Sequence, residues 1–221
     1  MKFAKKHIER LDLEHHVFSF KKDFGYDLDE IIGILGERGK EREHGACSYC
    51  GILRRKLLNL AAREVGADVI ATGHNLEDEA ETILLNVIRG DMLRLGRLDP
   101  HPRKIHESLI PRAKPFRLTP QAEIVMYCNI NDLEYQEIQC PYAVEAFRGI
   151  VRDFIFKTQE KQPMLCFNIV RGQDKIRPVL QTVEATKKLQ NCQKCGDATT
   201  NNLCKGCWLK EKIETVENIE Q

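Results

Sequence analysis

The chain has 221 residues, which is enough for one large domain or for one domain with a small module. Its 34 Lys and Arg residues and 33 Asp and Glu residues give a formal net charge of +1. This excludes a nucleic-acid-binding protein that is basic over its whole surface, but it allows a local basic patch. No apolar run is long enough for a transmembrane helix. Nine cysteines, six of them in CxxC pairs, favour metal or redox chemistry in a reducing, cytoplasmic compartment.

The N-terminal part of the chain is predicted to alternate strands and helices. Residues 13–20 read as a strand, and residues 24–35 read as a short amphipathic helix. Apolar residues then recur at helical spacing from Leu53 to Ala61, which predicts a helix over 51–65 that ends at Gly66.

A lone CxxC pair, Cys47 and Cys50, comes just before that helix. By itself the pair is ambiguous, because it fits a redox dithiol, half of a metal site or two buried thiols. A thiolate near a helix N-terminus is stabilised by the helix dipole, so this location favours reactive or ligating cysteines.

The next segment has the pattern of an α/β fold. Residues 67–72 form an apolar run suited to a buried parallel strand, and a turn at Gly73 and His74 leads into a helix over 76–89. Asn75 is predicted to cap this helix, with Asp78 in the capping-box position. A strand, a turn and a helix N-terminus in this order place ligands at the carboxyl ends of strands in a parallel sheet.

Residues 89–117 are predicted to form a basic loop interrupted by four prolines. Its eight basic residues against three acidic ones give 8 − 3 = +5, which suits a phosphate backbone. The alternative is a solvated loop whose arginines pair with acids elsewhere. Arg148 and Arg152 add a basic i, i+4 pair on a later helix. The basic residues of the loop are Arg89, Arg94, Arg97, Arg103, Lys104, Arg112, Lys114 and Arg117.

Three cysteines stand outside CxxC pairs. Cys140 precedes Pro141 at a predicted loop-to-helix junction, and from local pattern alone it reads as a core thiol, as Cys128 and Cys166 do. The helix that follows is predicted to bury an apolar stripe. The stripe consists of Ala143, Phe147, Ile150, Val151 and Phe154.

The last two CxxC pairs, with eight residues between them, predict a zinc site. Two tight CxxC turns close a tetrahedral cage of four thiolates, whereas two local disulfides would be strained and need oxidising conditions. The ligands are Cys192, Cys195, Cys204 and Cys207. We expect a main domain over 1–185, a four-cysteine zinc ribbon over 186–212 and a frayed helical tail over 213–221.

Together these segments resemble one family. The motifs are CSYCGILRRKLLNLAAREVGAD, IATGHNLEDEAETILLNVIRGD, IPRAKPF and CPYAVEAFRGIVRDF, followed by the last two CxxC pairs. In this order and spacing, over about residues 8–210, the chain resembles the tRNA 2-thiolation enzymes of the PP-loop ATP pyrophosphatase superfamily. Their archaeal and eukaryotic cytoplasmic group is the most similar, along with thermophilic 2-thioribothymidine relatives.

The resemblance implies roles for named residues. Cys47, Cys50 and Cys140 match the three cysteines that hold a 4Fe-4S cluster, whose fourth iron is open to accept sulfide. This reverses the core interpretation of Cys140. Asp78 matches an acidic residue that has a catalytic role in the family, although simple helix capping is the alternative, and Arg54 stands where a catalytic lysine is common. The nucleotide is expected to lie against Gly73, His74 and Asn75.

The resemblance also implies a reaction and partners. ATP with Mg²⁺ would adenylate O2 of a tRNA uridine, at position 34 or 54, and sulfur would then replace that oxygen as AMP leaves. The partners would be tRNA, a ubiquitin-like sulfur carrier protein and a second copy in a homodimer, with no membrane.

One feature of the superfamily is not found in this sequence. The Ser-Gly-Gly-x-Asp-Ser loop, whose backbone amides cradle pyrophosphate, does not occur in the 46 residues before Cys47, and neither does an N-terminal zinc module. We therefore expect the chain to be an incomplete form with weak affinity for ATP phosphates. ATP-dependent tRNA thiolation by this chain alone would contradict that expectation.

Two other functions fit parts of the sequence. A different PP-loop enzyme, such as an amidating or tRNA-lysidine ligase, would share the ATP chemistry but would not need the three cluster cysteines. A non-catalytic tRNA-binding scaffold would keep the zinc site and the basic loop, but it would not require Cys140 or Asp78.

Overall fold

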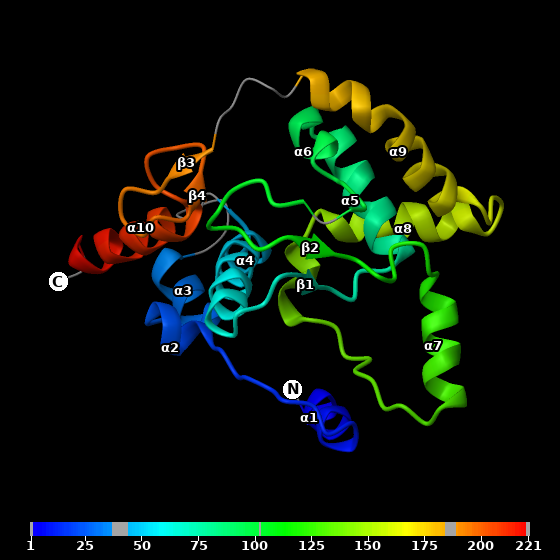
Figure 1. The fold of residues 1–221 in the computed structure, drawn as a ribbon, viewed down its shortest axis with the longest axis horizontal. Helices are drawn as coiled ribbons and strands as arrows, with labels where there is room; N and C mark the ends of the chain where they lie inside the picture. The colour runs from blue at the N-terminus through cyan, green and yellow to red at the C-terminus, as the bar shows by residue number, and fades with distance from the viewer. Residues whose placement is uncertain (1, 37–43, 102, 184–188, 220–221) are drawn as a thin grey trace.

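Two groups of helices flank a short pair of parallel strands in the computed structural model, which describes residues 2–36, 44–101, 103–183 and 189–219 (Figure 1). The elements are α1 Lys2–Arg10, α2 Phe20–Phe24, α3 Leu28–Leu35, α4 Ala46–Glu64, β1 Ile70–Ala71, α5 Leu76–Ile88, α6 Met92–Gly96, β2 Arg112–Ala113, α7 Gln121–Ile130, the 3-10 helix η1 Pro141–Glu145, α8 Arg148–Gln159, α9 Leu165–Val183, β3 Gln190–Asn191, β4 Ala198–Thr199 and α10 Lys205–Ile219. Within the described ranges, no helix is both long and apolar enough to cross a membrane.

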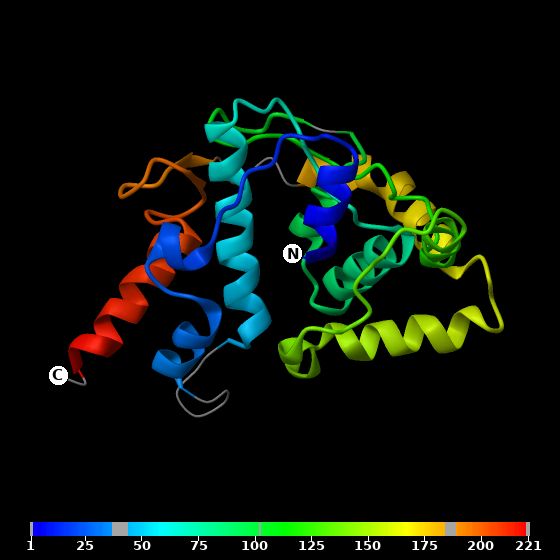
Figure 2. The same ribbon diagram turned by 90° about the horizontal axis from the view of Figure 1, so that it is seen from below.

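Each helical group has its own apolar core. Helices α5, α6, α8 and α9 pack together around residues such as Leu76, Ile83 and Val170. Helices α2, α3, α4 and α10 pack around Tyr49 and Leu209. Figure 2 shows α4 standing between α10 on one side and the α5–α9 group on the other. Helix α4 belongs to the second core and contacts β1 and η1 on its other side.

The strands pair in parallel, as predicted. Ile70 of β1 lies opposite Arg112 of β2, and Ala71 lies opposite Ala113. The connection between them contains α5 and α6, so this is a strand–helix–strand crossover. Helix α5 begins where the sequence predicts, because Asn75 and Asp78 form the expected capping box.

The N-terminal predictions are partly wrong. Residues 13–19 form no strand, and Leu13 and Val17 are exposed, so the apolar alternation has no partner strand against which to pack. The single helix predicted over 24–35 is two helices, because Gly25 adopts a left-handed conformation with φ of 90° and ends α2. Asp27 then starts α3 with its own capping box.

Two predictions about apolar residues also need correction. Cys166 is fully buried, as predicted, and burial raises the pKa of its thiol to about 11. Cys128 is only half-buried, because α7 buries none of its side chains. On α8 the buried positions are Val151 and Ile155, whereas Ile150 is exposed, so the predicted stripe is mostly wrong. Phe147 and Phe154 of that stripe are exposed as well.

The C-terminal helix is longer and better packed than the sequence suggested. Helix α10 continues through the predicted boundary at residue 212, and Ile213 is buried against the α3–α4 core. The helix therefore belongs to the second core rather than forming a frayed tail. The predicted boundary between residues 185 and 186 lies outside the described residues.

Candidate functional site

Cys47 and Cys50 lie in the first turn of α4, slightly inside the helix rather than before it. Gly45 precedes the helix and offers no side chain to cap it. The free N–H groups of the first turn therefore make this end of the helix favourable for anions. Cys47 is exposed and Cys50 is half-buried, so both sulfur atoms are accessible for chemistry. These two cysteines and the segment around them are called the cysteine turn below.

Cys140 lies on the chain segment that packs against the cysteine turn. It directly precedes η1, in which Pro141 occupies the first position as predicted. The Cys47 Sγ–H donates to the carbonyl oxygen of Tyr142 at 3.5 Å, and the Tyr142 hydroxyl donates to Asp29. Cys140 itself is exposed, so its core interpretation is wrong. The fold thus brings two segments that lie far apart in the sequence to one end of α4.

The three sulfur atoms are nevertheless not gathered into a tight group. In the described part of the chain, only the four C-terminal cysteines place their ligand atoms within 4.8 Å of one another. The assignment of Cys47, Cys50 and Cys140 to one cluster therefore stays a prediction. A cation does stand beside them, because Arg54 Nη2 lies 3.1 Å from Cys50 Sγ. The guanidinium therefore places a positive charge next to this sulfur atom.

The carboxyl end of β1 leads into the predicted nucleotide segment. His74 Nδ1 lies 2.9 Å from Thr72 Oγ1, and burial lowers the pKa of His74 more than the nearby Asp78 carboxylate raises it. The N–H of Asn75 donates to Asp78 Oδ2 at 3.3 Å. These residues surround the N-terminus of α5, where backbone N–H groups and the helix dipole favour anions. No described contact tests the predicted roles of Gly73, His74, Asn75 and Asp78.

A buried carboxylate that the sequence analysis missed ties α8 to this end of α5. Glu81 accepts hydrogen bonds from Arg148 and from Arg152, the latter at 2.8 Å. Arg148 Nη2 also donates to Asp78, at 3.0 Å to the backbone oxygen and 3.2 Å to Oδ1. The predicted basic pair is therefore an internal ion-pair network rather than a free surface. In the sequence, the only indication of this network was that Glu81 lies one helical turn after Asp78.

The basic loop is largely compensated, in line with the alternative interpretation. Lys114 pairs with Glu79, and Arg117 forms two hydrogen bonds of 2.9 and 2.8 Å with Asp174. Two further pairs within the loop are Arg94 with Asp91 and Arg103 with Asp99. Four of the eight predicted basic residues are thus held by acids, which reduces the surface available to phosphates. The segment also includes Pro102, which lies outside the described residues.

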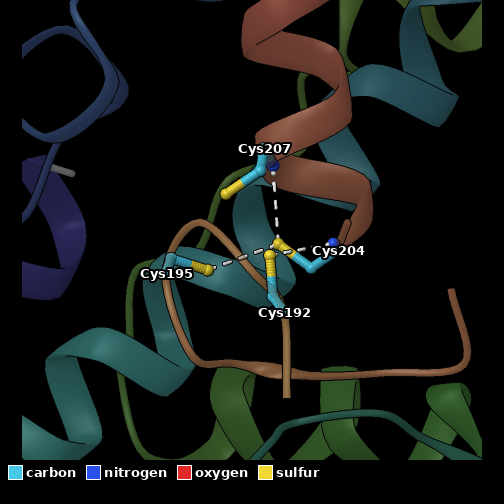
Figure 3. A group of neighbouring side chains, drawn as sticks. All are labelled: Cys192, Cys195, Cys204 and Cys207. Carbon is cyan, nitrogen blue, oxygen red and sulfur yellow. Dashed lines mark hydrogen bonds between the residues drawn. The ribbon is translucent and has the colours of Figure 1, made fainter. Parts of the chain in front are cut away.

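The four C-terminal cysteines form a candidate metal centre, because their sulfur atoms all lie within 4.8 Å of one another (Figure 3). Cys192 and Cys195 come from the loop after β3, while Cys204 and Cys207 come from the start of α10. Burial alone would raise the pKa of Cys192, but backbone N–H groups, led by that of Cys204, lower it to about 6. Four sulfur atoms this close together provide the donor set of a four-coordinate metal site.

Helix α4 also contacts the metal centre. Lys56 Nζ lies 2.9 Å from Asp197 and 3.1 Å from Cys195 Sγ, and Arg63 holds the other Asp197 oxygen at 3.0 Å. Burial alone would lower the pKa of Lys56, but the hydrogen bonds to Asp197 and Cys195 raise it overall. A Cβ on Gly206 would come within 2.5 Å of Lys56 Cδ. One helix therefore carries the cysteine turn at its start and supports the metal centre with its middle.

Comparison with known proteins places this arrangement in a family. The model of the PP-loop domain matches residues 44–159, from the cysteine turn to the end of α8. The chain belongs to the PP-loop domain family. Its short parallel strand pair and surrounding helices are therefore part of a PP-loop fold of the α/β class.

Several relatives of this PP-loop protein have names. It is 34% identical over 217 residues to the tRNA 2-thiolation protein NcsA of Haloferax volcanii, covering 94% of this chain and 66% of the relative. It is 33% identical to the cytoplasmic tRNA 2-thiolation protein 1 of Saccharomyces cerevisiae, covering 96% of this chain and 59% of the relative. The chain thus spans about three-fifths to two-thirds of the length of these relatives.

A solved structure is similar to most of this PP-loop protein. It is the U34-tRNA thiolase NcsA from Methanococcus maripaludis with its 4Fe-4S cluster, which matches with a TM-score of 0.77 at 30% identity. The match covers 96% of this chain and 64% of the solved chain. Both the PP-loop region and the C-terminal cysteine centre therefore lie within the part that the two proteins share.

Proposed function

We propose that this PP-loop protein takes part in the 2-thiolation of a tRNA uridine. The observation that carries the proposal is the match to a solved U34-tRNA thiolase over 96% of the chain, combined with the packing of Cys47 against the turn that follows Cys140. The names of the archaeal and eukaryotic relatives support the same reaction and a cytoplasmic location.

The cysteine turn is proposed to hold a 4Fe-4S cluster together with Cys140. Three thiols and one adjoining guanidinium, from Arg54, suit an anionic cluster chemically, and all three cysteines are at least half-accessible. When bound, such a cluster would supply sulfur through an iron atom that has no cysteine ligand. The task of Arg54 in this scheme is to stabilise thiolate charge, since a guanidinium does not release a proton at neutral pH.

The N-terminus of α5 is proposed to contact the activating nucleotide. ATP with Mg²⁺ would adenylate O2 of the uridine with release of pyrophosphate, and sulfur would then replace that oxygen at C2 as AMP leaves. Gly73, His74 and Asn75 would line the nucleotide. Asp78, whose carboxylate is held by Asn75 and Arg148, would be kept oriented for its role in the reaction.

The four-cysteine centre is proposed to bind Zn²⁺ with a structural role. Four thiolate ligands leave no open coordination position, so the ion would stabilise the fold rather than catalyse the reaction. This centre would form the predicted module over 186–212. A ubiquitin-like sulfur carrier and a second copy of the chain complete the proposed set of partners.

Anaerobic reconstitution with iron and sulfide tests the cluster and the reaction separately. The wild-type chain should develop the broad visible absorption of a 4Fe-4S cluster, and Cys140→Ala should lose it. Cys128→Ala removes a half-buried thiol that belongs to neither cysteine group, so it should keep the spectrum. Formation of 2-thiouridine in a tRNA transcript, with Mg-ATP and sulfide, then tests the reaction itself.

The outcomes separate the candidate functions. If the wild-type chain forms no cluster but still binds tRNA and zinc, the non-catalytic scaffold is the better description. If Cys128→Ala loses as much of the spectrum as Cys140→Ala, the three-cysteine assignment is wrong.

A further inference from the structure

Two arginines beside the cysteine turn have no acidic partner within the part of the chain that the structure describes. They are Arg55 of α4 and Arg112 of β2, and every charged group recorded close to Arg55 is another arginine. Arg55 is exposed and Arg112 is half-buried. Several other arginines of the described chain are paired with acids, whereas these two form a local excess of positive charge.

The position of Arg112 is fixed by contacts around it. Its Nη2 donates to the backbone oxygen of Arg55 at 3.1 Å, which places the guanidinium on the surface of α4. Just upstream, the buried Asn59 side chain accepts from Ile110 N at 2.9 Å and donates to Ser108 O at 2.7 Å. Because the loop is anchored to α4 two residues before Arg112, this side chain is preorganised rather than free to follow a counter-ion.

The guanidinium of Arg55 lies toward the cysteine turn. A Cβ added to Gly51, the residue after Cys50, would lie 3.6 Å from Arg55 Nη2. Arg54, its neighbour in the chain, contacts Cys50 Sγ itself. The unpaired charge is therefore adjacent to the cysteines rather than on a remote surface.

The positive charges of Arg55 and Arg112 favour the binding of an anion. Although the side chain as a whole is exposed, partial desolvation of its guanidinium lowers the pKa of Arg55, and the positive charges of Arg112, Arg94 and Arg54 lower it further. The guanidinium groups still carry full charge at neutral pH, so they repel one another. A bound phosphate would relieve this repulsion, and guanidinium groups match phosphate oxygens in geometry.

We propose that Arg55 and Arg112 form a binding site for a phosphodiester of the RNA backbone next to the cysteine turn. The proposal rests on the proposed function, which identifies the RNA as tRNA, and it adds the place where that substrate is held. A backbone phosphate fits better than the phosphates of a nucleotide. The nucleotide segment follows the carboxyl end of β1, whereas Arg112 is the first residue of β2 and contacts α4.

The test is the salt dependence of RNA binding by the full chain. Fluorescence anisotropy with an unmodified tRNA transcript, over about 50 to 200 mM salt, gives the slope of log affinity against log salt concentration. Each lost phosphate contact lowers the magnitude of that slope by about 1. Arg55→Gln and Arg112→Gln should each show this change, and the double variant should lose about 2.

Arg171→Gln is the matched control, because it removes the same charge from an exposed position on α9 and should leave the slope unchanged. Circular dichroism establishes that every variant is folded. The affinity for a fluorescent ATP analogue is measured in parallel, and it should be unaffected in the double variant.

The proposed site would be wrong if the folded double variant kept the wild-type slope, or if Arg171→Gln lowered the slope by the same amount. It would also be wrong if the variants weakened only the binding of the ATP analogue, or if tRNA binding by the wild-type chain did not depend on salt. Failure of thiolation is a separate outcome. If no 2-thiouridine forms but the two variants lower the slope, the RNA site holds and only the proposed reaction fails.

Discussion

Replacing Glu81 by alanine tests whether the α5–α8 network holds the predicted site together. The carboxylate has only 3% of its side chain exposed, and it accepts hydrogen bonds from Arg148 and Arg152, which are 34% and 53% exposed. Arg148 is also bound to Asp78, so the network connects the segment after Cys140 with the N-terminus of α5. Loss of Glu81 removes the acceptor that both arginines share.

The expected cost follows from these exposures. Breaking a fully buried ion pair costs about 3–5 kcal/mol, because the remaining charge has no partner and no water. Here both arginines can turn to solvent, so we expect Glu81→Ala to lower the free energy of unfolding by about 2–3 kcal/mol. Arg152→Gln leaves Glu81 paired with Arg148 and removes a half-exposed group, so its cost should be at most about 1 kcal/mol.

Urea denaturation followed by far-UV circular dichroism measures both variants. The slope of free energy against urea should stay the same, so that the shift of the midpoint reports stability alone. If Arg152→Gln costs as much as Glu81→Ala, or if Glu81→Ala costs less than about 0.5 kcal/mol, the carboxylate is not the centre of the network.

Three further predictions concern the metal centre and the nucleotide segment. Cys204→Ser should lose the zinc that the wild-type chain retains through dialysis, as measured by mass spectrometry, and hydrogen exchange over residues 190–207 should become faster. An unchanged zinc content would contradict the four-thiolate site. Asp197→Asn leaves Lys56 without its buried counter-ion, so the free energy of unfolding should fall by about 1–3 kcal/mol in urea. Asp68→Asn, at an exposed position, is the control and should change it by less than about 0.5 kcal/mol. Burial lowers the pKa of His74, so its contribution to stability is complete above about pH 6.5 and is lost as the pH falls toward the folded-state pKa. The stability of the wild-type chain should therefore fall more than that of His74→Gln between about pH 7 and pH 5, and equal falls would refute the assignment.

Local chemistry in the sequence determined the pieces of the candidate sites. Asn75 and Asp78 predicted the start of α5 because a capping box depends only on residues three positions apart. The spacing of the two C-terminal CxxC pairs predicted the four-sulfur group, since a knuckle is closed by its own short loop. Cys166 was recognised as a core thiol from its apolar neighbours.

Tertiary structure alone decided which pieces meet. Nothing local predicts that Cys47 contacts the turn after Cys140, because that contact depends on how η1 packs on α4. The charge of Arg148 and Arg152 suggested a free surface, yet a buried acid on another helix neutralises both. Conversely, Arg55 and Arg112 look like any other arginines in the sequence. In the described structure they are distinguished by the other arginines close to Arg55 and by the contact of Arg112 with α4, because both features depend on neighbours in space rather than along the chain.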